Sequence, residues 1–323
     1  MNTQFRFRKT LLALGGAALA LALAACSTSA PGGEDASASA ATRSVSTANG
    51  SVKIPAHPKR IVSIHSFSTE SLLDFGITPV GVEDAGAEYV PQRYLKRWEP
   101  IEKVVQGGKV NLEKIAALKP DLIIGVDVPY LRDVYPKLEA IAPTVFAPFD
   151  EKSTWATYPA YTADYINAEP KLTELKKRYD DRIAEVSKKY ADQLAKTKWD
   201  IIQGGFDDGN YWIYSDKTQV GTVLSALGAK FASATAGTPA GQNQSVSYER
   251  TDLLSDADAI VYYENNDGTP ANNIAKLFAL PGYQELPAVK AGLSIGTQDF
   301  LSGSYSDSLG IIDSIESTLK KIK

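Results

Sequence analysis

Short apolar runs alternate with amphipathic segments along most of this 323-residue chain. The runs at 60–64 and 121–126 have the length and the Ile, Val and Leu content of buried strands, whereas 68–75 and 111–118 carry apolar residues at helical spacing. Strands and helices in alternation predict an α/β lobe built on a mostly parallel sheet. The alternation resumes near residue 199, so the pattern predicts a second Rossmann-like α/β lobe.

One long helix is predicted between the two lobes. Apolar residues recur every three or four positions on one face of this segment, and the other face is rich in Lys, Arg, Asp and Glu. The apolar positions are Leu172, Leu175, Tyr179, Ile183, Val186, Tyr190 and Leu194. A helix of roughly 27 residues is about 40 Å long. We therefore expect a rigid helix at 169–196 to join an N-terminal lobe at 51–168 to a C-terminal lobe at 197–323.

The first 25 residues have the pattern of a secretory signal peptide. A basic start is followed by an apolar stretch at 11–25, which is shorter than the roughly 20 residues that a membrane span needs. Cys26, the only cysteine in the chain, follows directly. Small residues before a cysteine resemble a lipobox, so we expect Cys26 to be the acylated first residue of the mature protein. The alternative is a buried thiol after an ordinary signal peptide.

Residues 26–50 are rich in Ser, Ala, Thr and Gly and are predicted to be a disordered tether. A lipid on Cys26 would then hold the folded lobes to a membrane through this tether. The expected location is therefore outside the cell, anchored to the outer face of the bacterial cell membrane.

Composition argues against several classes of function. Removing residues 1–25 takes away three of the 34 basic residues and none of the 38 acidic ones, which leaves a net charge of −7 and disfavours a nucleic-acid partner. Two histidines and one cysteine cannot form a His- or Cys-rich metal site. The sequence contains no nucleophile elbow, zinc-peptidase, phosphate-loop or dinucleotide-binding motif. We expect a binding protein without a cofactor and not an enzyme.

Several segments resemble the substrate-binding proteins of iron–siderophore and cobalamin ABC importers. They occur in the family's order and span nearly all of 52–323, and the run from Val110 to Ile124 is the most specific of them. The segments are 75–82, 110–124, 247–249, 256–261 and 286–289. The resemblance implies two α/β lobes joined by one rigid helix, a ligand held between the lobes, and delivery of that ligand to a membrane permease. We expect a monomer.

The resemblance also implies two glutamates, one on each lobe, that dock onto arginines of the permease. By position within their motifs these are Glu113 and Glu249. An exposed carboxylate can form a bidentate pair with a guanidinium and fix the orientation of the two proteins. The alternative for Glu113 is a surface charge in the first turn of a helix, where the helix dipole favours it.

Ligands of open α/β lobes bind beyond the carboxyl ends of the strands, so the loops there hold the candidate contacts. Arg93 and, one turn further on, Arg97 could contact the partially negative oxygens of a ferric chelate, or could be solvated surface arginines. His65 follows the first strand and could contact the ligand or its metal, or cap the helix near Ser68. Aromatic residues in these loops could form the wall of the pocket. They are Tyr89, Tyr130, Phe206, Tyr211, Trp212 and Tyr263.

The distribution of arginines favours one class of ligand. After the predicted connecting helix the only arginine is Arg250, which lies beside a predicted docking glutamate. A trianionic ferric catecholate needs cations from both lobes, so we expect a ferric siderophore of the hydroxamate or mixed type. The alternatives are a haem- or cobalamin-binding lipoprotein of the same transporter class, and a surface adhesion or sensing lipoprotein.

Overall fold

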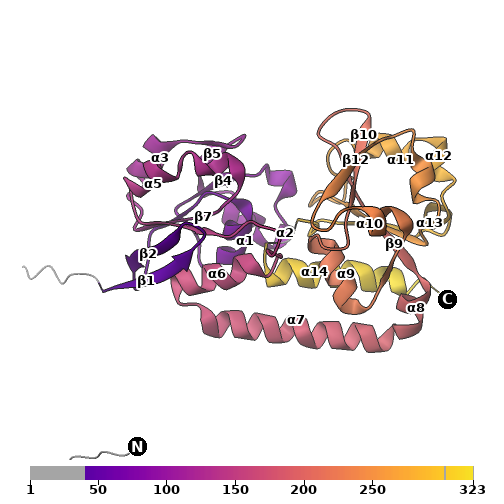
Figure 1. Cartoon of the computed structure of the whole chain (residues 1–323), viewed down its shortest axis with the longest axis horizontal. Coiled ribbons are helices and arrows are strands. Elements are labelled where there is room, and N and C mark those ends of the chain that lie inside the picture. The colour runs from indigo at the N-terminus through magenta and orange to yellow at the C-terminus, as the bar shows by residue number, and fades with distance from the viewer. Residues whose placement is uncertain (1–40, 302, 323) are drawn as a thin grey trace, which may run out of the picture. The chain divides into compact units, whose positions relative to one another are not determined.

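The computed structural model describes residues 41–301 and 303–322 (Figure 1). These residues belong to one compact unit that begins at Ala40. The predicted signal peptide, Cys26 and the tether up to residue 40 lie outside the described residues. Among the described helices, none combines the length and the apolar character that crossing a membrane requires.

The N-terminal lobe is built on a six-stranded sheet with the order β6-β5-β4-β3-β7-β8. All neighbouring pairs are parallel except β5 and β6. The strands are β3 (Ile61–Ser63), β4 (Gly81–Asp84), β5 (Glu102–Gln106), β6 (Lys109–Val110), β7 (Leu122–Val126) and β8 (Thr144–Ala147). The helices are α1 (Ser66–Asp74), η1 (Ala87–Tyr89), α2 (Gln92–Trp98), α3 (Leu112–Ala117), α4 (Pro129–Arg132), α5 (Tyr135–Glu139) and α6 (Thr157–Ile166).

The C-terminal lobe has a second six-stranded sheet, with the order β12-β10-β9-β13-β14 and with β11 also paired to β9. Strands β9, β11, β13 and β14 are parallel, and β10 and β12 are antiparallel to their neighbours. The strands are β9 (Lys198–Gly204), β10 (Asn210–Tyr214), β11 (Lys230–Phe231), β12 (Asn243–Ser247), β13 (Ala259–Tyr263) and β14 (Ser294–Thr297). The helices are α9 (Gln219–Leu227), α10 (Ser233–Gly237), η2 (Thr251–Leu254), α11 (Ile274–Phe278), α12 (Pro281–Gln284), α13 (Pro287–Lys290) and α14 (Tyr305–Leu319).

These two sheets confirm the predicted fold class of two α/β lobes with mostly parallel strands. Each lobe has its own apolar core. In the N-terminal lobe β7 is buried along its whole length, as expected for a parallel strand covered on both faces. In the C-terminal lobe Trp199 and Ile201 of β9 are fully buried against α9 and α14.

The prediction of a disordered tether extending to residue 50 is wrong at its C-terminal end. Strands β1 (Thr42–Thr47) and β2 (Gly50–Pro55) form an antiparallel hairpin. Only two of its side chains, Val45 and Ile54, are fully buried, and they pack against Tyr165 and Leu122 of the N-terminal lobe. The polar composition of 42–50 concealed this hairpin because the lobe supplies the apolar surface on which it packs.

The connection between the lobes is two helices and not the single helix predicted for 169–196. Helix α7 (Glu169–Lys189) ends at Tyr190, whose backbone (φ −118°, ψ 28°) leaves the helical region, and α8 (Ala191–Lys196) follows. The Tyr190 ring is buried in the core of the C-terminal lobe, and its hydroxyl donates to Glu316 Oε1 (3.1 Å). This tertiary contact explains why the periodic pattern continues while the helix does not.

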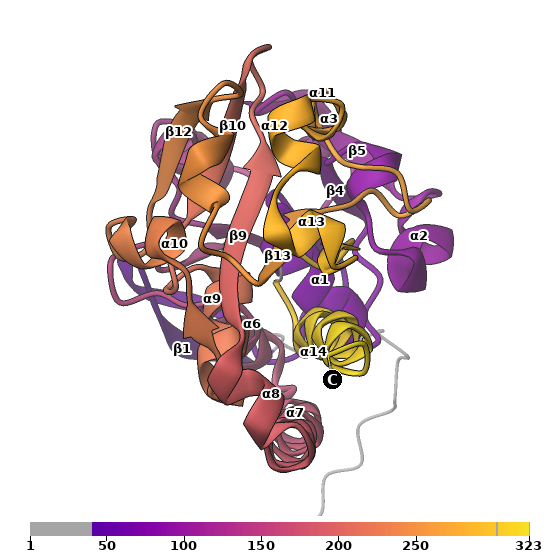
Figure 2. The same cartoon turned by 90° about the vertical axis from the view of Figure 1, so that its right-hand side faces the viewer.

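Helix α7 extends along the side of the two lobes and packs beside α14 (Figures 1 and 2). Arg182 of α7 pairs with Glu316 (2.6 Å) and Asp313 (3.0 Å) of α14. The hydrogen bond from Arg182, with smaller contributions from Lys189 and Tyr190, lowers the pKa of Glu316 to about 2. The connection is therefore braced against the C-terminal lobe along its charged face.

Candidate functional site

A cleft of about 310 Å³ opens between the two lobes. Its lining comes from the residues that end or follow strands β3, β4, β5 and β7 of the N-terminal lobe and β9, β13 and β14 of the C-terminal lobe. The carboxyl ends of parallel strands meet at one edge of each sheet, and both edges face the cleft. The site therefore lies where the strand pattern predicts it.

Five of the nine predicted ligand contacts line this cleft. They are His65, Tyr89, Tyr130, Phe206 and Tyr263. Tyr130 and Phe206 come from opposite lobes and are 51% and 73% exposed, which is unusual for large aromatic side chains. Tyr263 is buried deeper in the cleft, and Tyr89 donates from its hydroxyl to Asn272 Oδ1 (3.0 Å) across the lobes. Contact with a ligand remains a prediction for all five.

Two predicted aromatic contacts, Tyr211 and Trp212, do not line the cleft. Tyr211 is fully buried, stacks on Tyr248, and donates from its hydroxyl to the carbonyl of Arg250 (2.9 Å). Trp212 packs edge-on against Phe206, with ring centroids 5.0 Å apart. Both residues lie within β10, and side chains within a strand point to the two faces of the sheet. Neither side chain therefore points beyond the end of the strand, where the cleft lies. Trp212 supports a ring at the mouth of the cleft without lining the cleft itself.

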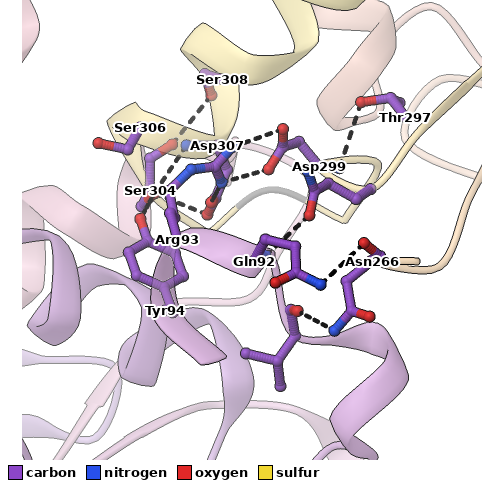
Figure 3. A network of polar contacts seen from close by, with 12 residues as sticks. Gln92, Arg93, Tyr94, Asn266, Thr297, Asp299, Ser304, Ser306, Asp307 and Ser308 are labelled. Carbon is purple, nitrogen blue, oxygen red and sulfur yellow. Dashed lines mark hydrogen bonds and ion pairs between the residues drawn. The ribbon is translucent and has the colours of Figure 1, made fainter. Parts of the chain in front are cut away.

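The two predicted anion contacts, Arg93 and Arg97, also do not line the cleft. Arg93 donates to Asp299 Oδ1 and Oδ2 (2.8 Å to Oδ2) and to Asp307 Oδ1 (2.5 Å), as Figure 3 shows. Arg97 donates to the carbonyl of Leu73 (2.7 Å) and to Thr78 Oγ1 (2.9 Å). Burial alone would lower the pKa of Arg93, but the two aspartates hold it above its ordinary value. Both guanidinium groups are bonded within the protein and neither lines the cleft, which corrects the expectation that they face a ligand.

Further hydrogen bonds join the lobes beside this ion pair. Asn266 Nδ2 donates to the carbonyls of Ala87 (2.7 Å) and Val90 (2.8 Å), and Gln92 N–H donates to Gln298 Oε1 (2.9 Å). Figure 3 shows this network around α2 and the N-terminal end of α14. The segment from η1 to α2 is thus held directly against the C-terminal lobe, and it forms one wall of the cleft.

The acidic residues that line the cleft were not predicted from the sequence. Five carboxylates line it, and the described lining residues include no lysine or arginine. The acids are Glu70, Glu83, Asp84, Asp299 and Asp307. Three of them end or follow strands β4 and β14, which is the signal that could have identified them. An uncompensated anion is costly to bury, so these acids define the electrostatics of the site.

Burial raises the pKa of several of these acids. The pKa of Glu83 is raised to about 7, although Ser66 N–H donates to its Oε2 (2.8 Å) and opposes the shift. The pKa of Asp307 is raised to about 6, with Arg93 opposing the effect of burial. The pKa of Glu70 is raised well above its ordinary value by burial and by the nearby Asp307 and Asp299. These shifts favour the protonated form of the acids up to a higher pH than is usual for carboxyl groups.

His65 is the N-cap of α1 and also lines the cleft. Its Nδ1 accepts the N–H of Phe67 (3.2 Å), so the capping alternative is confirmed. Burial lowers the pKa of His65 to about 4, which keeps the ring neutral near pH 7. A neutral ring that accepts at Nδ1 carries its proton on Nε2. His65 can therefore offer a hydrogen-bond donor, but not a free nitrogen lone pair, to a ligand.

The two predicted docking glutamates are exposed. Glu113 lies in the first turn of α3, where Asn111 caps the helix by accepting Lys114 N–H (3.0 Å), and Glu249 follows β12 in the C-terminal lobe. Elements α3 and β12 both lie along the upper edge of the lobes in Figure 1, on the side opposite to α7. A docking role for these two residues remains a prediction. Among the described residues, no group of three or more His, Cys, Asp or Glu side chains is arranged to hold a metal ion.

Comparison with curated proteins finds several relatives, and two of those from Bacillus subtilis are described here. The probable siderophore-binding lipoprotein YfiY is 36% identical over 194 residues, which cover 59% of this chain and 58% of YfiY. The iron(3+)-hydroxamate-binding protein YxeB is 31% identical over 199 residues, which cover 61% of this chain and 59% of YxeB. The matches therefore span less than two thirds of the length of either relative.

Solved structures match over more of the chain. The siderophore periplasmic binding protein from the fuscachelin gene cluster of Thermobifida fusca is 33% identical, with a TM-score of 0.74, and the match covers 83% of this chain and 98% of that one. The family model described as periplasmic binding protein matches residues 61–298, which include both sheets and the connecting helices. With its two α/β lobes and its interlobe cleft, this chain belongs to the periplasmic binding protein family, a family of substrate-binding proteins and not of enzymes.

Proposed function

We propose that this chain is the extracytoplasmic substrate-binding lipoprotein of an ABC importer and that it captures a ferric siderophore of the hydroxamate or mixed type. The family match, the siderophore- and hydroxamate-binding relatives and the interlobe cleft support this function. The cargo is the ferric chelate itself, so no resident cofactor is involved. We expect the protein to act as a monomer.

The acidic lining of the cleft favours a chelate without a net negative charge. Five carboxylates line the cleft, and Arg93, which contacts two of them, is already paired with Asp299 and Asp307. A trianionic ferric catecholate would be repelled by these acids and would find no free cation among the described lining residues. A ferric trishydroxamate is neutral at its metal centre and avoids this cost. Tyr130, Phe206 and Tyr263 offer aromatic surface for its carbon backbone.

His65 argues against haem as the ligand. Haem binding through this histidine would need a free lone pair on a ring nitrogen that faces the cleft. Because Nδ1 is occupied by the N–H of Phe67, the proton lies on Nε2. The same N–H is suited to donate to a hydroxamate oxygen.

The anchor and the docking residues complete the proposal. Acylation of Cys26 would keep the protein at the outer face of the membrane, where the permease lies. Glu113 and Glu249, one on each lobe, would then pair with arginines of the permease. The lipid shortens the search for the permease, and the two glutamates fix the orientation of the docked protein.

A panel of chelates tests the proposed ligand. Trp98 lines the cleft and Trp212 supports its mouth, so binding should change tryptophan fluorescence. Ferric desferrioxamine B, ferric enterobactin, ferric citrate, haem and cobalamin would each be titrated and checked by native mass spectrometry. Gallium(III) forms of the chelates would control for quenching by iron itself. We expect a ferric hydroxamate to bind with a Kd of about 1 μM or lower.

Two results would contradict the proposal. Preferential binding of enterobactin or citrate would show that the charge of the cleft does not select the ligand. Binding of haem or cobalamin alone would place the protein with another cargo.

A further inference from the structure

Glu70 is an acid of the cleft that forms no ion pair with a described residue, although Arg93, which donates to Asp299 and Asp307, lowers its pKa. It lies on α1, one turn after the His65 cap, and its side chain lines the floor of the cleft. Its Oε2 is buried and accepts no N–H or O–H from a described residue, apart from the hydrogen bond that the carboxyls of Glu70 and Asp307 share when one of them is protonated. A buried carboxylate oxygen without a partner is costly, and native proteins rarely keep one without a reason. Among the described residues, the fold therefore supplies no donor for this oxygen when both carboxyls are ionised.

The acidic neighbours of Glu70 make its ionised form less favourable unless a cation lies nearby. Asp299 and Asp307 lie beside it, and both are almost fully buried. Arg93 is the only guanidinium in contact with these aspartates in the described part of the chain, and its donors are directed to them and not to Glu70. Three carboxylates share one guanidinium, so the floor lacks positive charge when all three are ionised. A cation that enters the cleft would supply the missing positive charge.

We propose that Glu70, together with Asp307, binds a protonated amine carried by the ferric chelate. This inference rests on the proposed function, and it narrows the substrate class to ferric hydroxamates that bear a free ammonium group. An ammonium has three donors and a flexible aliphatic stem. Leu73, Val90 and Leu301 line the same cleft and give that stem an apolar surface. A bare metal ion fits less well, since the described acids form no metal-binding group.

Binding of the amine also displaces a proton. Burial and the two aspartates raise the pKa of Glu70 well above its ordinary value, which favours a proton on this carboxyl before a ligand binds. The charged and titratable groups that face Glu70 are Arg93 of α2, Asp299 and Asp307 before and within α14, and Tyr263 of β13. An ammonium beside Glu70 favours its ionised form and lowers its pKa. The proton then leaves to solvent, and affinity for the amine-bearing chelate rises with pH.

The test compares two chelates that differ only in this charge. Ferric desferrioxamine B has a free terminal ammonium, and its N-acetyl derivative is neutral at that end. The wild-type protein is expected to bind the ammonium form at least about 10-fold more tightly at pH 7.5. Glu70→Gln is expected to reduce this preference to about threefold or less. The control Glu88→Gln removes the same charge from an exposed residue that does not line the cleft, and should retain the preference.

Proton release gives a second measurement that does not depend on a variant. Isothermal titration of the wild-type protein in phosphate and in Tris buffer should show net proton release with the ammonium chelate and none with the acetylated one. Cadaverine alone should not compete at millimolar concentration, because it lacks the rest of the chelate.

The possible outcomes separate the role of Glu70 from the binding of ferric hydroxamates. Equal affinity of the wild type for the two chelates, or equal proton release, would overturn the role of Glu70 and leave hydroxamate binding intact. Competition by cadaverine at the affinity of the chelate would assign the site to free amines and overturn the inference. Binding of neither chelate would overturn the inference and the proposed hydroxamate function together.

Discussion

Replacing both Glu113 and Glu249 with alanine is expected to reduce uptake of the ferric chelate at least about 10-fold while leaving its affinity for the protein unchanged. Each carboxylate is exposed, so its loss should not disturb the fold. Each would lose a charge-assisted pair with the permease that forms only on docking. Uptake of radioactive iron by cells with the variant as their only copy, together with the Kd of the purified protein, measures the two effects separately.

The control for this prediction is a pair of glutamates on another part of the surface. Glu151 and Glu169 are exposed and outside the matched motifs, so their alanine variants should transport normally. Single replacements of Glu113 and Glu249 should each have an intermediate effect, because the lobes dock together. Normal uptake by the double variant would show that these residues are ordinary surface charges. A matching loss of chelate affinity would assign them to the structure of the cleft and not to docking.

Replacing Arg93 with methionine is expected to lower the free energy of unfolding by about 3 kcal/mol at pH 7.5. The Arg93 side chain is 29% exposed, whereas the carboxylates of Asp299 and Asp307 are only 4% and 1% exposed. Removal of the guanidinium leaves two buried acids with no counter-charge from it. It also removes the ion pair that joins α2 to the C-terminal lobe. Urea unfolding of the variant and the wild type measures this loss.

The loss should shrink at low pH. Burial raises the pKa of Asp307 from 3.8 to about 6, and the pKa of Asp299 is raised in the same direction. A raised folded pKa stabilises the protein fully below the unfolded pKa of about 3.8, and this contribution is lost as the pH rises through about 6. Without Arg93 both values rise further, so the variant should recover much of its stability at pH 5.

The matched control is Arg97→Met, one turn further along the same helix. Arg97 bonds only to a carbonyl and a hydroxyl, so its loss should cost about 1 kcal/mol with little dependence on pH. Equal losses for the two variants, or a loss for Arg93→Met that is independent of pH, would contradict the description of this network.

The two-lobe fold could be predicted from the sequence because the pattern of hydrophobic residues indicates most of its strands and helices. Strands such as β7 are continuous apolar runs, and α7 has an unbroken apolar face. The errors lie where tertiary contacts override the local pattern. The hairpin at 42–55 has the composition of a linker, and its strands are explained only by the packing of Val45 and Ile54 on the N-terminal lobe. The connecting helix ends at Tyr190 because the ring of this residue packs in the core of the C-terminal lobe.

The site was predictable only in part, for a related reason. His65, Tyr130 and Phe206 follow strand ends, and position in the fold alone brings them to the cleft. Arg93 was expected to face the ligand because its partners could not be seen. Asp299 lies 206 residues away in the chain, and no local pattern links the two. Charge alone gives little help, because it does not distinguish the few buried acids among 38 acidic residues; only the position of three of them at strand ends does.

The position of the iron tests the central claim most directly. Crystals of the protein with a ferric hydroxamate, measured at the iron absorption edge, would locate the metal by its anomalous signal. We expect a single strong peak within the interlobe cleft, between Tyr130 and Phe206. A peak outside this cleft, or saturating binding in solution with no iron between the lobes, would contradict it.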